Sequence, residues 1–153
     1  MIRTLAALAL LFAVSLAARE PTHRLFVSNE ADGTVSVIDS RTHEPIKTVE
    51  VGKRPRGIGF SPDRSRVYVA LGDEDSIGVI DTQTLEVVKK LQAGSDPEAF
   101  DVHPNGHIYL SNEDAGLASV LDPETGKIVA EIEVGIEPEG VAVTPDGRYV
   151  MVT

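Results

Sequence analysis

The sequence predicts an all-β protein assembled from a repeated four-stranded unit. The unit contains four short apolar runs, rich in Val and Ile and bounded by Gly, Pro, Asp, Asn or Ser, which are strand and turn signals. This set of runs recurs over residues 24–63, 66–105 and 107–146, and an incomplete fourth copy begins at residue 148. A repeat of about 40 residues determines the architecture before any single residue determines the chemistry.

Residues that mark equivalent positions confirm that the copies are in phase. The Asp that closes the second run falls at Asp39, Asp81 and Asp122, in steps of 42 and 41 residues. The other markers in the same steps are Gly52, Gly94 and Gly135, then Pro55, Pro97 and Pro138, and Pro62, Pro104 and Pro145.

Each run has a predicted place in the unit. In the second run Val35 and Val37 share one face, as do their equivalents in the later copies. The third run alternates apolar residues with Glu or Lys, which predicts a half-exposed outer strand. The fourth runs, 57–60, 99–102 and 140–143, contain small residues that suit close packing around a narrow axis, so we expect them innermost.

Four-stranded antiparallel units repeated around an axis are typical of a β-propeller. The first copy begins with what would be the second strand of a blade. Three units and a stub also fall short of the roughly four to eight blades that close a ring. We therefore expect an N-terminal fragment of about three and a half blades, from a ring of about seven.

The N-terminus predicts export. Arg3 precedes an apolar run from Leu5 to Val14 and then small residues, the order found in a secretory signal peptide. We assign residues 1–18 to the signal peptide and 19–153 to the partial propeller, with no stable membrane span after cleavage and a periplasmic or secreted location. The absence of cysteine excludes disulfides and zinc-thiolate sites. A net charge of −10 argues against nucleic acid as a partner.

The strand motifs resemble YVTN-type β-propeller repeats. Segments 24–29, 66–70 and 107–112 read RLFVSN, RVYVA and HIYLSN, followed by Val-Ile-Asp or Val-Leu-Asp and then by motifs such as Val-Gly-x-x-Pro-x-Gly. A signal peptide leading into the first repeat is similar to the exported YncE-like propellers found with pyrroloquinoline quinone (PQQ)-dependent alcohol catabolism. Related propellers include lactonases, haem-binding nitrite reductases, surface-layer proteins and docking proteins, so the fold leaves the function open.

Several motifs that contain potential ligands are interpreted as structural. The Asp-x-x-Thr sets recur in every copy, which favours capping of turn amides over chemistry. The segment from Asp122 to Lys127 resembles repeats of PQQ-dependent dehydrogenases, but the tryptophan that follows there is absent, so we predict no bound cofactor. His103 and His107 lie near one turn without a third ligand, and we predict no metal.

The candidate site lies on one face of the blades. Loops between the first and second runs, and between the outer strand and the next inner strand, meet there by antiparallel connectivity. At the entrance to the axis, the residue after each marker proline is Arg56, Glu98 or Glu139. The other candidates for binding on this face are Asp73, Asp75, Glu113 and Asp114. The ligand is a cation, a basic protein surface or a small polar molecule.

These observations predict an exported, non-enzymatic propeller that acts as a binding or scaffold protein through its charged loop face. The family resemblance implies support of periplasmic PQQ-linked alcohol oxidation, with a quinoprotein dehydrogenase or a cytochrome as partner. One alternative is an enzyme of the propeller lactonase type. Another is a structural repeat of the cell envelope or surface layer.

Overall fold

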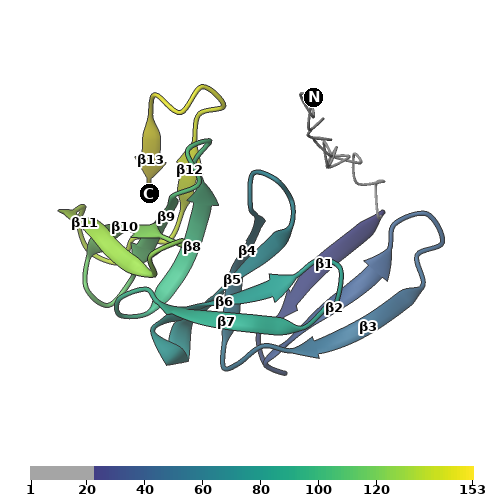
Figure 1. The fold of residues 1–153 in the computed structure, drawn as a ribbon. Coiled ribbons are helices and arrows are strands. Elements are labelled where there is room, and N and C mark those ends of the chain that lie inside the picture. The colour runs from purple at the N-terminus through teal and green to yellow at the C-terminus, as the bar shows by residue number, and fades with distance from the viewer. Residues whose placement is uncertain (1–22) are drawn as a thin grey trace, which may run out of the picture.

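Residues 23–153 are described by the computed structural model, and they form three antiparallel sheets followed by a two-stranded hairpin (Figure 1). The first sheet contains β1 (Arg24–Asn29), β2 (Thr34–Asp39) and β3 (Pro45–Glu50). The second contains β4 (Pro55–Phe60), β5 (Arg66–Leu71), β6 (Ser76–Asp81) and β7 (Val87–Gln92), with the short 3-10 helix η1 (Gly72–Glu74) between β5 and β6. The third contains β8 (Pro97–Val102), β9 (Ile108–Asn112), β10 (Leu117–Asp122) and β11 (Lys127–Glu133). The hairpin contains β12 (Val141–Val143) and β13 (Val150–Val152).

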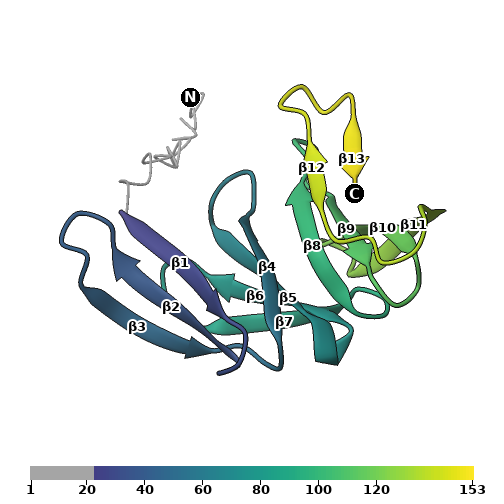
Figure 2. The same ribbon diagram turned by 180° about the vertical axis from the view of Figure 1, so that it is seen from behind.

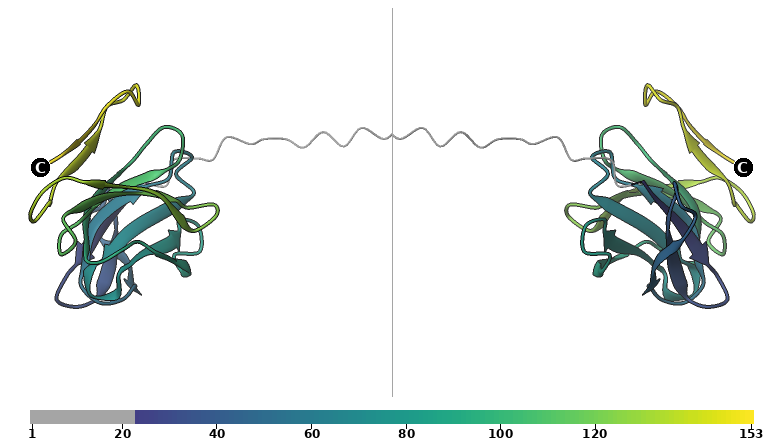
Figure 3. Two further views of the ribbon diagram at one scale, coloured as in Figure 1. Left: turned by 90° about the vertical axis from the view of Figure 1, so that its left-hand side faces the viewer. Right: turned by 90° about the vertical axis from the view of Figure 1, so that its right-hand side faces the viewer.

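The sheets are successive propeller blades. In the second and third sheets the strands lie in chain order, each antiparallel to its neighbour. Seen from the side, the sheets lie largely behind one another (Figure 3). The predicted all-β architecture of four-stranded antiparallel blades is therefore confirmed, with β1–β3 forming a three-stranded blade and β12–β13 a two-stranded one. The predicted signal peptide lies outside the described residues.

The fourth run of each repeat forms the innermost strand, as its small residues predict. β4 lies against β8, and β8 lies against β12, so the inner strands are neighbours in space (Figure 2). A Cβ atom at Gly57 would approach the Glu98 carbonyl oxygen to 2.9 Å, and one at Gly59 would approach the Phe100 ring to 3.0 Å. Glycine therefore permits the close approach of two inner strands.

The core consists of two apolar layers between the blades. Val35 and Val37 of the first blade are fully buried, in a cluster that also contains Val67 and Val69 of the second. The other face of the second blade packs on the third through a separate cluster, which includes Ile77. Alternate residues of one strand thus serve two different interfaces. No helix within residues 23–153 has the length and apolar character needed to cross a membrane.

Candidate functional site

One face of the blades is organised by a hydrogen bond that recurs in each repeat. The loop after the outer strand donates a backbone amide to the loop between the first and second runs of the same repeat. The three pairs are Val51 to Gly33 at 3.0 Å, Ala93 to Asp75 at 2.9 Å and Val134 to Gly116 at 3.1 Å. These bonds confirm that the two sets of loops share a face, and we call it the loop face.

Arg54 is the centre of an ion-pair network on this face. Its Nη1 atom lies 2.5 Å from Asp96 Oδ1, and its Nη2 atom lies 2.6 Å from Glu98 Oε1. The same guanidinium lies 3.8 Å from Glu113 Oε2 and 3.6 Å from Glu30 Oε1. One cation from the second blade therefore contacts carboxylates of the first and third blades.

Arg56 enters the same network two residues further along the chain. Its guanidinium pairs with Glu98 Oε2 and lies 3.0 Å from Glu30 Oε1. Its backbone carbonyl accepts a hydrogen bond of 2.9 Å from the Ser28 hydroxyl. Both oxygens of Glu98 are thus bound to arginine, a charge-assisted arrangement that fixes the carboxylate in place. We call Arg54, Arg56, Asp96, Glu98 and Glu113 the axial cluster.

Burial and crowding raise the pKa of two carboxyl groups in the axial cluster. Glu98 is only 3% exposed, and this burial, with a hydrogen bond to Glu113, raises the pKa of Glu98 against the opposing effect of Arg56 and Arg54. Burial also raises the pKa of Asp96, opposed by Arg54 and reinforced by Glu113 and Asp114. Burial and crowding in the cluster therefore favour the protonated forms of Asp96 and Glu98, although two arginines lie beside them.

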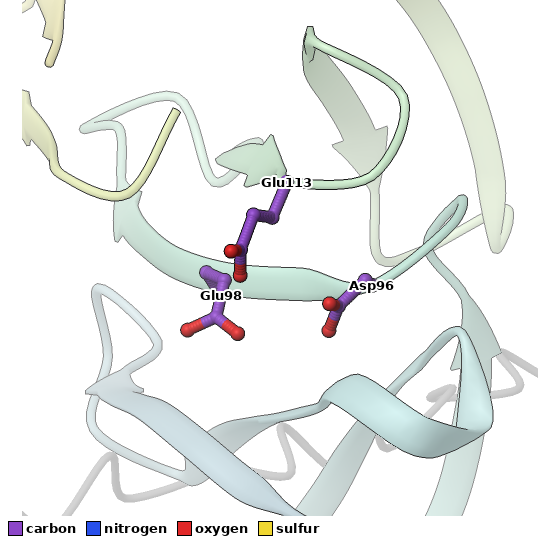
Figure 4. A group of neighbouring side chains, drawn as sticks. All are labelled: Asp96, Glu98 and Glu113. Atoms are coloured by element: carbon purple, nitrogen blue, oxygen red, sulfur yellow. The ribbon is translucent and has the colours of Figure 1, made fainter. Parts of the chain in front are cut away.

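Asp96, Glu98 and Glu113 are the residues here that resemble metal ligands. Figure 4 shows their carboxylates converging from the start of β8 and the turn after β9. One oxygen from each lies within 4.8 Å of the others, and carboxylate oxygens suit Ca²⁺ or Mg²⁺. Arg54 contacts all three residues, however, so a metal ion would have to displace this guanidinium.

The structure brings together only some of the residues predicted for binding. Arg56, Glu98 and Glu113 belong to the axial cluster, whereas Glu139, the third residue after a marker proline, is exposed. Asp73, Asp75 and Asp114 are exposed on the loop face, and Asp75 accepts a 3.0 Å hydrogen bond from the Asp96 amide. The predicted residues therefore divide into a buried network and an exposed acidic surround.

The sequence prediction left Arg54 and Asp96 out of the site. At the entrance to the axis, that prediction selected only the residue after each marker proline. Arg54 and Asp96 precede the prolines Pro55 and Pro97, where the third repeat has Glu137. The residue before each marker proline is basic in the first repeat and acidic in the next two. This change of charge was the signal that could have identified Arg54 and Asp96.

Two grooves occupy equivalent places on the loop face and differ in charge. The first, about 860 Å³, lies between the first two blades and includes Glu30, Asp32 and Asp73 together with Lys53, Arg54 and Lys90. The second, about 550 Å³, lies on the third blade and has only acidic charged residues: Glu113, Asp114, Glu133 and Glu137. Ile136 also lines it and is 94% exposed. The second groove therefore presents acidic side chains with no basic residue in its lining, and it adjoins the axial cluster through Glu113.

The Asp-x-x-Thr sets cap turns, as predicted. Asp39 accepts hydrogen bonds from the Arg41 and Thr42 amides, at 2.8 and 3.4 Å. The equivalent carboxylates, Asp81 and Asp122, each accept two amides in the same way. Hydrogen bonds from the side chain and amide of Arg41 lower the pKa of Asp39 to about 2. These aspartates stabilise local backbone and do not converge on a common site.

The two histidines considered as metal ligands are half-buried. His103 Nδ1 accepts the Asn105 amide at 3.1 Å, and Nε2 lies 2.8 Å from the Gly147 carbonyl oxygen. With Nδ1 as acceptor, Nε2 carries the proton and donates to that carbonyl. His103 thus joins the third blade to the loop between β12 and β13.

The blades and the loop-face network define a protein of the β-propeller class. Solved structures agree: the chain is similar to hydrazine synthase from Kuenenia stuttgartiensis, with 22% identity and a TM-score of 0.79 over 93% of this chain and 45% of that one. It is also similar to the dihydro-heme d1 dehydrogenase NirN in complex with DHE, with 24% identity and a TM-score of 0.71 over 88% of this chain and 30% of that one. The chain thus spans less than half the length of either structure.

More specifically, the chain belongs to the YNCE-like beta-propeller family, whose model matches residues 63–147, more than half of the chain. No curated protein matches the sequence. The predicted family is therefore confirmed.

Proposed function

We propose that this protein is an exported binding propeller that docks a partner with a basic surface on its loop face. The observation that carries the proposal is the axial cluster, in which two arginines hold the nearly fully buried Glu98, while Asp114 and Glu137 beside the cluster are exposed. A network fixed from two blades keeps the loops in one arrangement, which lowers the entropic cost of binding. The exposed carboxylates then supply charge complementarity.

The second groove is the proposed contact region. It combines four carboxylates with the exposed side chain of Ile136. A Lys or Arg side chain fits such a place, because its charged end meets carboxylates while its aliphatic stem covers apolar surface. The family resemblance suggests the role: support of periplasmic PQQ-linked alcohol oxidation, with a quinoprotein dehydrogenase or its cytochrome acceptor as the partner.

The test is co-purification of the tagged full chain with a periplasmic quinoprotein alcohol dehydrogenase and its cytochrome. We expect a complex that weakens as salt is raised, because exposed ion pairs are screened. Asp114→Asn combined with Glu137→Gln should reduce capture at least about tenfold, the effect of losing about 1.4 kcal/mol of binding free energy.

The matched control removes two negative charges from exposed residues in the turns of the opposite face, by Glu44→Gln with Glu86→Gln. Capture by this control variant should equal that of the unchanged protein. Equal losses in both variants would indicate an effect of net charge alone and contradict the proposed contact region.

The second candidate function is a lactonase activity, and the buried carboxyl group of Glu98 favours it. Burial and a hydrogen bond to Glu113 raise the pKa of Glu98, the type of perturbation that general acids show. Hydrolysis of a simple lactone by the unchanged protein, lost in Glu98→Gln and retained in Asp114→Asn with Glu137→Gln, would favour the enzyme over the binding propeller.

A further inference from the structure

A third groove lies between the second and third blades, on the face opposite the loop face. Its volume is about 500 Å³, a size that suits a small-molecule site. Its lining comes from β5 and from the turns β4–β5, β8–β9 and β10–β11. Both blades contain four paired strands, so a complete blade bounds the groove on each side. We call it the turn-face groove.

Tyr68 of β5 supplies a buried polar group to the turn-face groove. The residue is only 6% exposed, and its hydroxyl group has no hydrogen-bond partner among residues 23–153. In that part of the chain, the sealed side-chain polar atom without a partner is Ser76 Oγ, so the Tyr68 hydroxyl opens into the groove that it lines. Buried tyrosine hydroxyl groups usually have a partner, and here the groove is where one would lie.

Carboxylates from both blades lie near this hydroxyl. Asp63 of the second blade and Glu124 of the third line the groove. Burial raises the pKa of Tyr68, and the negative charges of Glu124 and Asp63 raise it further, against the opposing effect of Arg66. The Glu124 side chain is exposed and has no ion pair or hydrogen bond among residues 23–153. The hydroxyl and this carboxylate are therefore both available to a ligand.

The groove continues toward the outer strand of the second blade. This extension has a volume of about 280 Å³ and shares Tyr68 and Glu124 with the main groove. Val79, Val88 and Leu91 contribute apolar surface to it. A ligand that is held at the Tyr68 hydroxyl can therefore place an apolar chain along the extension.

The positive side chains along the groove and its extension have partners within the fold. Arg66 pairs with Asp81 and donates to the Ser65 carbonyl oxygen at 3.0 Å. Lys89 Nζ donates to the Pro123 carbonyl oxygen at 3.2 Å. Neither contact involves the two groups that are available to a ligand, which are a hydroxyl oxygen and a carboxylate.

The repeat shows that this pair of groups belongs to one interface. At the interface between the first and second blades, the equivalent of Tyr68 is Phe26 and the equivalent of Glu124 is Gln83. That interface therefore lacks both the hydroxyl and the carboxylate. The interface between the second and third blades is built from the same elements but carries different chemistry.

We propose that the turn-face groove binds an alkylammonium group, whose N–H donors contact the Tyr68 hydroxyl oxygen and the Glu124 carboxylate. An ammonium group offers donors and no acceptor, which matches these two oxygen acceptors. Its charge strengthens both hydrogen bonds, and its alkyl chain lies along the extension. A free amine and a lysine side chain share this chemistry. The site does not rest on the partner proposed for the loop face.

The first experiment titrates the unchanged full chain with butylammonium chloride at constant ionic strength and follows the amide chemical shifts by NMR. We expect saturable shifts at residues 66–68 and 122–124. Butanol has the same alkyl chain without the charge and should bind at least about tenfold more weakly, because hydrogen bonds to charged groups are the stronger ones. Equal affinity for butanol would overturn the proposal, and so would shifts that are confined to the loop face.

Two near-isosteric variants test the contacts. Tyr68→Phe should weaken butylammonium binding about fivefold, and Glu124→Gln, which removes the charge, about tenfold. The matched controls are Tyr109→Phe, at the equivalent position of the third blade, and Glu131→Gln, which removes an exposed charge of β11 outside the groove. Both controls should bind like the unchanged protein. Affinity that stays the same in Tyr68→Phe and Glu124→Gln would contradict the assignment.

Two further measurements define the site. The loop-face variant, Asp114→Asn with Glu137→Gln, should bind butylammonium like the unchanged protein, whereas a loss of binding would place the amine on the loop face and overturn the proposal. The blocked peptide acetyl-Gly-Lys-Gly-amide separates the two sources of the ammonium group. Tighter binding of the peptide than of butylammonium would support a site for lysine side chains, and tighter binding of butylammonium would support a site for free amines.

Discussion

The turns on one side of the blades and the axial cluster on the other use the same residue types for different purposes. Asp39, Asp81 and Asp122 occupy the same position in successive repeats and cap the turn that follows each of them. Glu98 holds a position that varies between repeats, and its partners come from the neighbouring blade. Repetition therefore identifies the residues that build the fold, and departure from the repeat identifies the residues that distinguish this protein.

The pKa directions separate the two groups of carboxylates as well. Hydrogen bonds from backbone amides, the Thr125 hydroxyl and arginine side chains lower the pKa values of the turn aspartates. Burial comes first among the causes that raise the pKa values of Asp96 and Glu98. The turn carboxylates thus favour folding as anions, whereas the axial carboxylates are crowded when ionised.

Removal of Arg54 should produce the largest change in stability. The substitution Arg54→Ala leaves the buried Glu98 with one arginine and leaves Asp96 without its ion pair. Uncompensated buried charge is costly, so we expect a loss of about 2 kcal/mol in the free energy of unfolding. Urea denaturation followed by circular dichroism measures this difference.

The neighbouring Lys53 provides the control for Arg54. Lys53 is exposed, and Lys53→Ala should change the free energy of unfolding by no more than about 0.5 kcal/mol. Equal effects of the two substitutions would show that the axial cluster contributes no more than an ordinary surface residue.

A smaller effect is expected from a capping aspartate. Asp81 accepts the Gln83 amide at 2.8 Å and the Thr84 amide at 3.0 Å. Asp81→Ala removes the carboxylate oxygen that accepts both bonds, and we expect a loss of about 1 kcal/mol in the same urea measurement. Asp81→Asn keeps an acceptor oxygen and should recover much of that loss, whereas no recovery would mean that the charge, and not the turn, matters.

The smallest effects are in the pH dependence, and they have opposite signs in the two regions. The lowered pKa of Asp122 means that its contribution to stability is present above its ordinary value of 3.8 and is lost as the pH falls through the folded-state pKa. The raised pKa of Glu98 means that its contribution is present below its ordinary value of 4.5 and is lost as the pH rises through the folded-state pKa.

Urea titrations from about pH 3 to about pH 7 test this contrast through two amide variants. Relative to the unchanged protein, Asp122→Asn should become less stable as the pH rises through the acidic range, and Glu98→Gln should become more stable. The same trend in both variants would remove the distinction between the two groups of carboxylates.

The sequence predicted the blades because the signals are local. Strand alternation, turn residues and the marker prolines all act within a few residues of one another, and the period of the repeat aligns them. The small residues of the fourth runs also predicted a crowded inner strand, which the contacts of Gly57 and Gly59 confirm.

The axial cluster was harder to predict because its partners come from different blades. Arg54 contacts Asp96 and Glu98, which are 42 and 44 residues away along the chain. Comparison of the residues that follow the marker prolines identified Arg56 and Glu98. The residues that precede the same prolines, Arg54 and Asp96, were missed. The direction in which a long side chain crosses between blades depends on the packing, and no spacing in the sequence specifies it.

A double-mutant cycle between Arg54 and Glu98 tests the axial cluster most directly, with Arg54→Met and Glu98→Gln measured singly and together by urea denaturation. We expect a coupling energy of about 2 kcal/mol between these residues of neighbouring blades. A coupling energy within about 0.3 kcal/mol of zero would mean that the two residues act independently, and it would contradict the claim that the axial cluster is a single built network.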